Sequence, residues 1–188
     1  YRVGTALLRA GLSTAQVTAT AAFIGGDPEV LLARTGQRIT VGSIIWETLA
    51  SGPPFAVRAS GDGEDPQENN AGTIGVAYVR GLSVLLTGDA EPEAQEALLA
   101  AGGVPDVVVI KVPHHGSANQ SAAFLAAARA EVAVASVGVD NGYGHPSSRT
   151  IGILIGAGTQ VWRTDQDGAV AVGLAGDSVL VIPRRRPP

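Results

Sequence analysis

The sequence predicts a mixed α/β (α+β) fold in which polar residues gather at one edge of a sheet. Short segments rich in Val, Ile and Leu alternate with segments of helical composition, most regularly in the second half of the chain. Residues suited to metal binding or acid–base chemistry directly follow three of the predicted strands. With 188 residues and 45% apolar content, the chain can form one domain with a sizeable core, which we expect to cover residues 1–188.

The composition excludes several functional classes. The chain has no cysteine, which excludes disulfides, thiolate nucleophiles and sulfur ligands, so any metal would need nitrogen and oxygen ligands. The net charge of -4 provides no overall basic field that would hold nucleic acid non-specifically. No apolar run approaches the roughly 18 to 20 residues of a membrane span.

For the first part of the chain, the sequence predicts several strands and one short helix. Asp27 suits an N-cap and Pro28 suits the first helical position, so a helix is expected to run to about Thr35 and stop at Gly36. The other elements expected before residue 50 are a weak strand at Val3–Leu8, a segment of undecided type at Thr14–Ile24, and a hairpin of Arg38–Val41 and Ser43–Leu49 joined at Gly42.

Residues 51–71 predict a mobile surface loop without regular structure, because prolines and acidic residues replace apolar periodicity there. After it, Thr73–Val79 and Leu82–Leu86 predict a hairpin that turns at Arg80-Gly81. The second of these strands is nearly all apolar, so we expect it to be buried on both faces.

The second half predicts an alternating β/α series. Its expected elements are a helix from Glu91 to Gly102, a strand at Asp106–Val112, a helix at Ser121–Ala130, a strand at Val132–Val137, a helix at Ser147–Ile155, and short strands at Val161–Arg163, Ala169–Val172 and Val179–Ile182. Residues 183–188 are expected to be a solvated basic and proline-rich tail.

Polar residues follow three consecutive strands of this series. Asp89 follows the first, the adjacent pair His114-His115 the second, and His145 lies in a Gly-His-Pro loop after the third; these are all the histidines of the chain. Neighbouring residues on an extended loop point to opposite sides, so one imidazole of the pair could bind a metal while the other faces a substrate. Taken singly, an aspartate such as Asp89 before a helix is more often a cap or turn residue, and His145 could equally hydrogen-bond to backbone.

Four segments closely resemble the metallo-β-lactamase-like domain at the C-terminus of ComEC-type competence (DNA internalisation) proteins, in that family's order and spacing. They are Leu85–Glu91, Val108–Ser117, Val137–Pro146 and Arg163–Gly168. The resemblance implies an αββα sandwich with two divalent metals, zinc or manganese, that activate water against a phosphodiester. It also implies a nuclease role in DNA uptake, with single-stranded DNA as substrate and the membrane channel portion of the parent protein as partner.

The resemblance also implies roles for individual residues. Asp89 would bridge both metals, and one of the two adjacent histidines, preferably His115, would be a ligand. His114 would then face the phosphate. His145 and Asn141 would line the substrate side, and Ser117 would bind a phosphate oxygen. The chain would be a soluble domain of an inner-membrane protein, with the membrane face left open.

The chain departs from the family pattern in two places. It lacks the family's main ligand block, His-x-His-x-Asp-His, and Asn69, Asn70 and Thr73 match another polar block only roughly. We therefore expect the chain to represent the C-terminal three quarters of the domain, with an N-terminally incomplete sandwich that self-associates through its open sheet. Too few ligands would remain to hold two ions, or to hold one ion tightly, so we expect the chain alone to be inactive and to bind metal weakly or not at all.

Two other functions remain open at this point. The chain could be a non-catalytic domain of the same fold that binds DNA or a protein partner through its histidine loops. It could also be an esterase of small phosphodiesters of the choline-phosphate type, which share the His-His-Gly arrangement.

Overall fold

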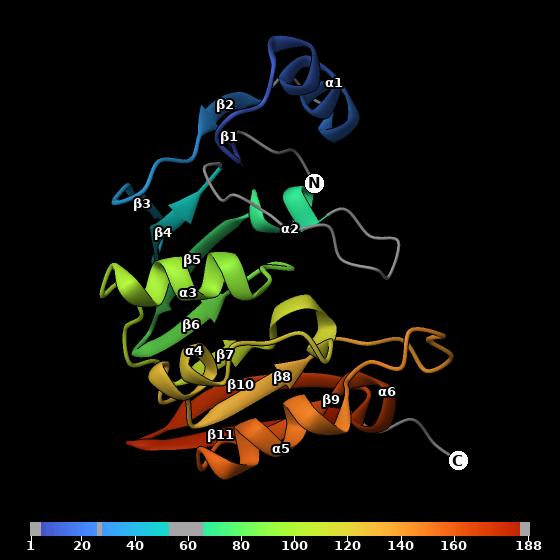
Figure 1. Ribbon diagram of the computed structural model, residues 1–188. Coiled ribbons are helices and arrows are strands. Elements are labelled where there is room, and N and C mark those ends of the chain that lie inside the picture. Colours follow the sequence, from blue (N-terminus) through green and yellow to red (C-terminus); the bar gives the residue numbers. More distant parts are fainter. Residues whose placement is uncertain (1–4, 26–27, 53–65, 185–188) are drawn as a thin grey trace.

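The computed structural model describes residues 5–25, 28–52 and 66–184. A mixed sheet in the order β3-β4-β5-β6-β7-β8-β9 forms its centre, and two separate strand pairs, β1-β2 and β10-β11, accompany it (Figure 1). The strands are β1 (Thr5–Leu8), β2 (Glu29–Leu32), β3 (Arg38–Val41), β4 (Ile44–Ser51), β5 (Thr73–Val79), β6 (Leu82–Leu86), β7 (Val109–Lys111), β8 (Val132–Ala135), β9 (Gln160–Arg163), β10 (Ala169–Ala175) and β11 (Ser178–Arg184). The helices are α1 (Thr14–Ile24), α2 (Pro66–Asn70), α3 (Pro92–Ala100), the 3-10 turn η1 (Pro113–Gly116), α4 (Ala122–Ala127), α5 (Ser148–Gly156) and α6 (Thr164–Asp167).

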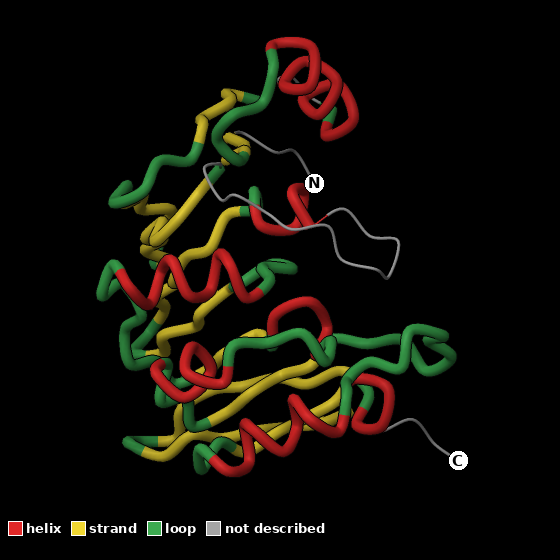
Figure 2. The backbone as a smooth tube through the Cα atoms, viewed as in Figure 1, coloured by secondary structure: helices red, strands yellow, loops and turns green. Residues whose placement is uncertain are grey.

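The central sheet changes direction at β6. Strands β3 to β6 pair antiparallel as a meander, whereas β6, β7, β8 and β9 pair parallel in chain order. When consecutive parallel strands are added in the same direction along a sheet, right-handed crossovers place their helices on the same face. Figure 2 shows α3, α4 and α5 together in front of the sheet. The predicted α/β class is confirmed, and the large mixed sheet is compatible with the expected sandwich. The carboxyl ends of β6 to β9 consequently share one edge.

The core lies between the sheet and these three helices. Side chains of β5 to β8 that face the helices are buried together with the inward-facing residues of α3, α4 and α5. Burial of this kind contributes about 25 cal/mol for each Å² of apolar surface removed from water, and it holds the sheet edge in place. The largest of these fully buried side chains are Phe124, Leu85, Ile110, Leu125, Leu154, Val76 and Val112.

The helix predicted from Pro28 to Thr35 is wrong. Glu29–Leu32 forms strand β2, which pairs parallel with β1 in the register Thr5↔Glu29 to Leu8↔Leu32. A cap and a proline favour a helix only weakly, and strand pairing with a segment 24 residues upstream outweighs that local signal. Asp27 lies outside the described residues.

Two loop predictions also need correction. Ser51 completes β4 and Pro66–Asn70 forms α2, so the loop predicted at 51–71 is too long at both ends; its residues 53–65 lie outside the described part. Pro183 and Arg184 belong to β11 instead of the tail predicted at 183–188, because they pair with Val170 and Ala169 of β10; residues 185–188 are outside the described part.

Strand β6 is not buried on both faces as predicted. Leu85 is fully buried, but Leu86 is 38% exposed because alternate side chains of a strand point to opposite faces. The helices cover only one of these faces. Within the described residues, no helix is both long and apolar enough to cross a membrane.

Helix α6 was not predicted, and an ion pair stabilises it. Arg163 donates two hydrogen bonds to Asp165, from Nε to Oδ1 at 3.1 Å and from Nη2 to Oδ2 at 2.6 Å. The side chain of Asp165 is only 13% exposed, and its hydrogen bonds with Arg163 lower the pKa of its carboxyl group. The hydroxyl group of the neighbouring Thr164 accepts a hydrogen bond from the N–H of Val137 and donates one to its carbonyl oxygen. The start of α6 therefore holds the loop after β8 in place.

This pair predicts a specific acid sensitivity. A carboxyl group whose pKa is lowered by folding stabilises the fold at pH values above its unfolded-state pKa of about 3.9. This stabilisation is lost as the pH falls through the pKa of the folded state. Asp165→Asn should therefore lower the free energy of unfolding by about 1 to 3 kcal/mol at neutral pH. The difference between native and variant should shrink below about pH 3.9 in urea unfolding. A difference that is independent of pH would contradict this role.

Candidate functional site

The loops after β6, β7 and β8 lie together at the carboxyl edge of the parallel strands. Asp89 follows β6, and His114 and His115 lie in η1 directly after β7. The backbone N–H of His114 donates to the carbonyl oxygen of Gly88 at 3.2 Å, which joins the first two loops. The N–H of Ser147 donates to the carbonyl oxygen of Gly116 at 2.8 Å, which joins the third.

The two adjacent histidines adopt a tight left-handed turn instead of the expected extended loop. The φ angles are 45° for His114 and 52° for His115, a conformation that costs non-glycine residues about 1 to 2 kcal/mol each. The hydrogen bonds of η1 to neighbouring loops hold this conformation. The rings still diverge, with centroids 6.4 Å apart and planes at 68°. The side chain of His114 is 8% exposed, whereas that of His115 is 44% exposed.

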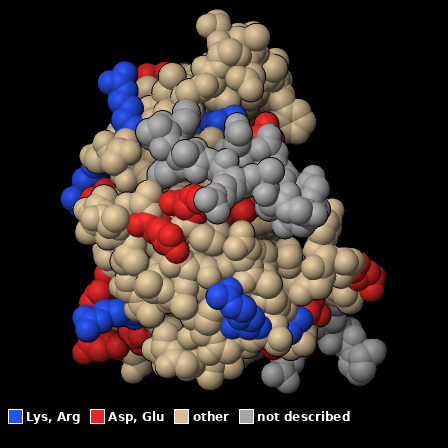
Figure 3. All heavy atoms as spheres, in the orientation of Figure 1, with Lys and Arg blue, Asp and Glu red and all other residues tan. Residues whose placement is uncertain are grey.

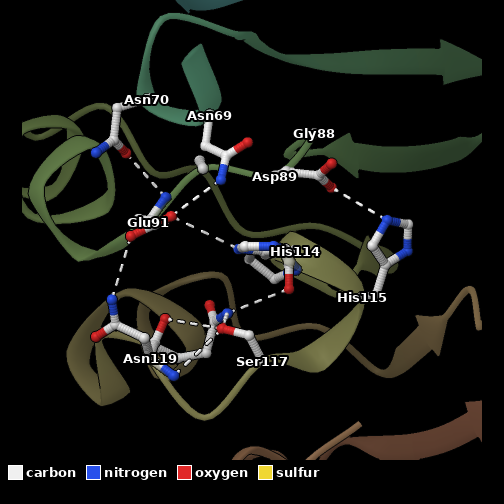
Figure 4. A network of polar contacts seen from close by, with 12 residues as sticks. Asn69, Asn70, Gly88, Asp89, Glu91, His114, His115, Ser117 and Asn119 are labelled. Carbon is white, nitrogen blue, oxygen red and sulfur yellow. Dashed lines mark hydrogen bonds and ion pairs between the residues drawn. The ribbon is translucent and has the colours of Figure 1, made fainter. Parts of the chain in front are cut away.

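His115 and Asp89 form a pair of potential metal donors (Figure 4). The ring nitrogen Nδ1 of His115 lies 2.6 Å from the carbonyl oxygen of Ser136, which can only accept, so Nδ1 is the donor of this hydrogen bond and Nε2 is the ring nitrogen that faces Asp89. That Nε2 atom lies 3.6 Å from Oδ1 of Asp89. Metal-binding histidines commonly donate their second nitrogen to a carbonyl in this way, because the bond fixes the ring orientation. The two side chains therefore place two potential donor atoms side by side.

Lys111 places a protein cation beside the same carboxylate. Its Nζ atom donates to the carbonyl oxygens of Gly88 at 2.8 Å and Val112 at 3.2 Å, and to Oδ1 of Asp89 at 3.4 Å. Burial lowers the pKa of Lys111, and the neighbouring Asp89 partly opposes that shift. No local pattern in the sequence indicates this role of Lys111. Any metal ion at Asp89 would have to share the carboxylate with this ammonium group.

Glu91 is the main residue that sequence reasoning missed. It resembled an ordinary acidic residue at the start of a helix, but its carboxylate is buried and faces the imidazole of His114, with Oε1 3.8 Å from Nδ1 (Figure 4). Oε1 accepts a hydrogen bond from Asn69 at 3.0 Å, and Oε2 accepts one from Asn119 at 3.2 Å. The N–H of Glu91 donates to Oδ1 of Asn70 at 2.9 Å. Glu91 therefore ties α2, α3 and the histidine loop together.

The loop after β8 brings His145 to the site. The ring of His145 lies edge-on to that of His114 at a centroid distance of 5.6 Å, and it stacks with Tyr143 at 6.0 Å. Asn141 holds this loop, because its Nδ2 donates to the carbonyl oxygen of His145 at 2.6 Å. A pocket of about 430 Å³ opens here, lined by His115, Ser136, Val137, Gly138, Asn141, Tyr143 and His145.

Ser117 is not part of this arrangement. Its side chain lies on the other side of His114 from Asp89 (Figure 4), and its hydroxyl group accepts hydrogen bonds from the N–H of Asn119 at 3.2 Å and from Nε2 of Gln120 at 3.4 Å. The hydroxyl group therefore serves the internal structure of the loop. The expected contact of Ser117 with a phosphate oxygen stays a prediction.

The donor set fits part of a metal site. Asp89 and His115 suit two coordination positions of one cation, since their donor atoms lie 3.6 Å apart and Nδ1 of His115 is held by a backbone carbonyl oxygen. Among the described residues, no group of three or more His, Asp or Glu side chains could hold a metal ion. These residues thus do not provide the donors for the two-metal centre that the resemblance implies.

The fold and these loops define an α/β protein with a polar site at the carboxyl edge of parallel strands. The chain is similar to "ComE operon protein 3" of Bacillus subtilis (strain 168), with 31% identity over 113 residues, or 59% of this chain and 15% of that protein. It is also similar to "Competence protein ComA" of Neisseria gonorrhoeae, with 38% identity over 96 residues, or 50% of this chain and 14% of that protein. No protein-family model matches. The chain is thus similar to two competence proteins over a small part of their length.

Proposed function

We propose that the chain belongs to a DNA-uptake protein and contributes to metal-dependent hydrolysis of phosphodiesters in single-stranded DNA. The observation that carries this proposal is the Asp89–His115 pair, in which the hydrogen bond from Nδ1 to Ser136 directs Nε2 of His115 toward the carboxylate, beside a pocket that His115 lines. The similarity to two competence proteins supports the biological setting. In this setting, the substrate strand would come from the membrane channel portion of the intact protein.

The described residues would take distinct parts in this reaction. A bound divalent metal would supply activated water by lowering the pKa of that water from about 15.7 towards 7. Asp89 and His115 would hold the ion, and His145 and Asn141 would line the substrate side. His114 lies behind the pair, where Glu91 fixes its position. Further donors would come from the intact protein, so the expected inactivity of the chain by itself remains a prediction.

Replacement of Asp89 by asparagine should abolish this activity. The full-length product of the reading frame is expected to cleave single-stranded DNA in the presence of Mn²⁺ or Zn²⁺, and Asp89→Asn should lower kcat by about 100-fold or more because a neutral amide binds a cation poorly. Asp106→Asn makes the same substitution at an exposed ion pair with Arg129 and should leave kcat unchanged. Cleavage that survives in Asp89→Asn would exclude this carboxylate from the reaction.

A non-catalytic DNA-binding role is the second candidate, and the ammonium group of Lys111 beside Asp89 favours it because this group occupies space near a metal position. An esterase of small diesters is the third. Parallel assays of the full-length product with single-stranded DNA and with a small chromogenic phosphodiester separate the three functions. We expect metal-dependent turnover of DNA; turnover of the small diester alone would indicate the esterase, and binding of DNA without turnover would indicate the non-catalytic role.

A further inference from the structure

Three aromatic rings form a row from the buried side of the site to the surface. His114 is buried, His145 lies edge-on to it at 5.6 Å, and Tyr143 stacks on His145 at 6.0 Å with 24° between the planes. Tyr143 itself is 75% exposed. The outer face of the Tyr143 ring is therefore accessible, so the row ends in a surface on which another flat group can stack.

The loop that carries Tyr143 is held in place by its own hydrogen bonds. Oδ1 of Asn141 accepts the N–H of Tyr143 at 3.1 Å and the N–H of His145 at 3.4 Å, while Nδ2 donates to the carbonyl oxygen of His145. A ring that is already ordered loses little conformational entropy when it binds a partner. The Asn141 side chain thus organises Tyr143 and His145 as one binding surface.

The surroundings of Tyr143 suit a nucleotide. The pocket of about 430 Å³ lies in the range of roughly 300 to 1,000 Å³ that is typical of small-molecule sites. His115 lines the same pocket and pairs with Asp89, so a base on Tyr143 would have its backbone close to the candidate metal donors. The neighbouring Val139, 51% exposed, adds apolar surface in the same loop.

The charge distribution favours recognition of bases over recognition of the phosphate backbone. The net charge is -4, and on the face in Figure 3 the visible Lys and Arg side chains are separated from one another instead of forming one patch. Backbone recognition of nucleic acid needs several clustered cations. Stacking of a base on an aromatic ring does not require clustered cations.

We propose that Tyr143 is a stacking platform for an unpaired nucleobase and that the adjacent pocket binds one nucleotide of single-stranded DNA. The inference rests on the proposed function, since it assigns a base-binding subsite to the same site. Duplex DNA would bind poorly there, because its bases are stacked on one another and cannot reach Tyr143. The subsite would therefore select single strands without reading their sequence.

Fluorescence anisotropy with a labelled single-stranded oligothymidylate tests this proposal. The chain is used with EDTA present, so that binding is measured in the absence of hydrolysis. We expect Tyr143→Ala to weaken binding about tenfold through the loss of one stacked base, and Tyr143→Phe to bind like the native chain. Phe23→Ala removes an aromatic ring that is 93% exposed on α1 and should have no effect.

An oligonucleotide with abasic sites separates base stacking from sugar or backbone contacts. On this probe, native chain and Tyr143→Ala should bind equally weakly. The proposal is overturned if the native chain does not bind the oligothymidylate, if Tyr143→Ala binds it as well as native chain, or if the tenfold loss persists on the abasic probe. Binding that depends on Tyr143 but is not followed by cleavage of DNA in the full-length product would overturn the hydrolase function while leaving the base-binding subsite intact.

Discussion

Gly116→Ala is expected to lower the free energy of unfolding by about 3 kcal/mol, because the new side chain would be both overpacked and in a left-handed backbone conformation. The substitution should also separate the two loops that carry the histidines. Gly116 has a φ of +88°, which side chains disfavour. A Cβ atom at this position would lie 2.5 Å from Cβ and 3.0 Å from Cα of Pro146, far inside contact distance. The clash would push the turn that carries His114 and His115 away from the loop that carries His145.

Gly144→Ala provides the matched control for this prediction. Gly144 has a similar φ of +72°, but a Cβ atom there would meet nothing within 4 Å. The control should therefore lose only the backbone contribution of about 1 to 2 kcal/mol. Urea unfolding of both variants measures the difference. Equal losses would show that the contact of Gly116 with Pro146 does not hold the two loops together.

Glu91→Ala is expected to destabilise the chain by about 3 kcal/mol, because hydrogen bonds to a buried charged group contribute about 1.5 to 3 kcal/mol each. The substitution removes the acceptor of the Asn69 and Asn119 amides and the carboxylate that faces His114. The loss should be accompanied by a displaced His114 ring, which is visible as a changed imidazole signal in NMR spectra.

Glu96→Ala makes the same substitution on helix α3 at an exposed position. It should change the free energy of unfolding by no more than about 0.5 kcal/mol. If Glu91→Ala unfolded at the same urea concentration as Glu96→Ala, the carboxylate of Glu91 would not be the connection between α2, α3 and the histidine loop.

The sequence was informative where neighbouring residues determine the structure. Hairpins at Gly42 and at Arg80-Gly81 follow from turn residues between apolar runs, and both are confirmed. The meeting of Asp89 with the histidine loops follows from the parallel order of β6 to β8, since the ends of parallel strands share an edge.

Features that depend on distant residues could not be predicted. Strand β2 needs β1 as a partner, and nothing within Glu29–Leu32 reveals it. The partners of Glu91 lie 21 to 28 residues away, so its burial has no local signal. The left-handed turn at His114 is likewise imposed by hydrogen bonds to loops elsewhere in the chain.

A Zn²⁺ titration of the chain with ¹⁵N-labelled histidines tests most directly whether Asp89 and His115 hold one cation. We predict that the Nε2 signal of His115 shifts on addition of Zn²⁺ in the native chain and in Asp106→Asn. The shift should be lost in Asp89→Asn. An Nε2 signal that does not respond to Zn²⁺, or that responds equally in Asp89→Asn, would contradict a metal site at this pair.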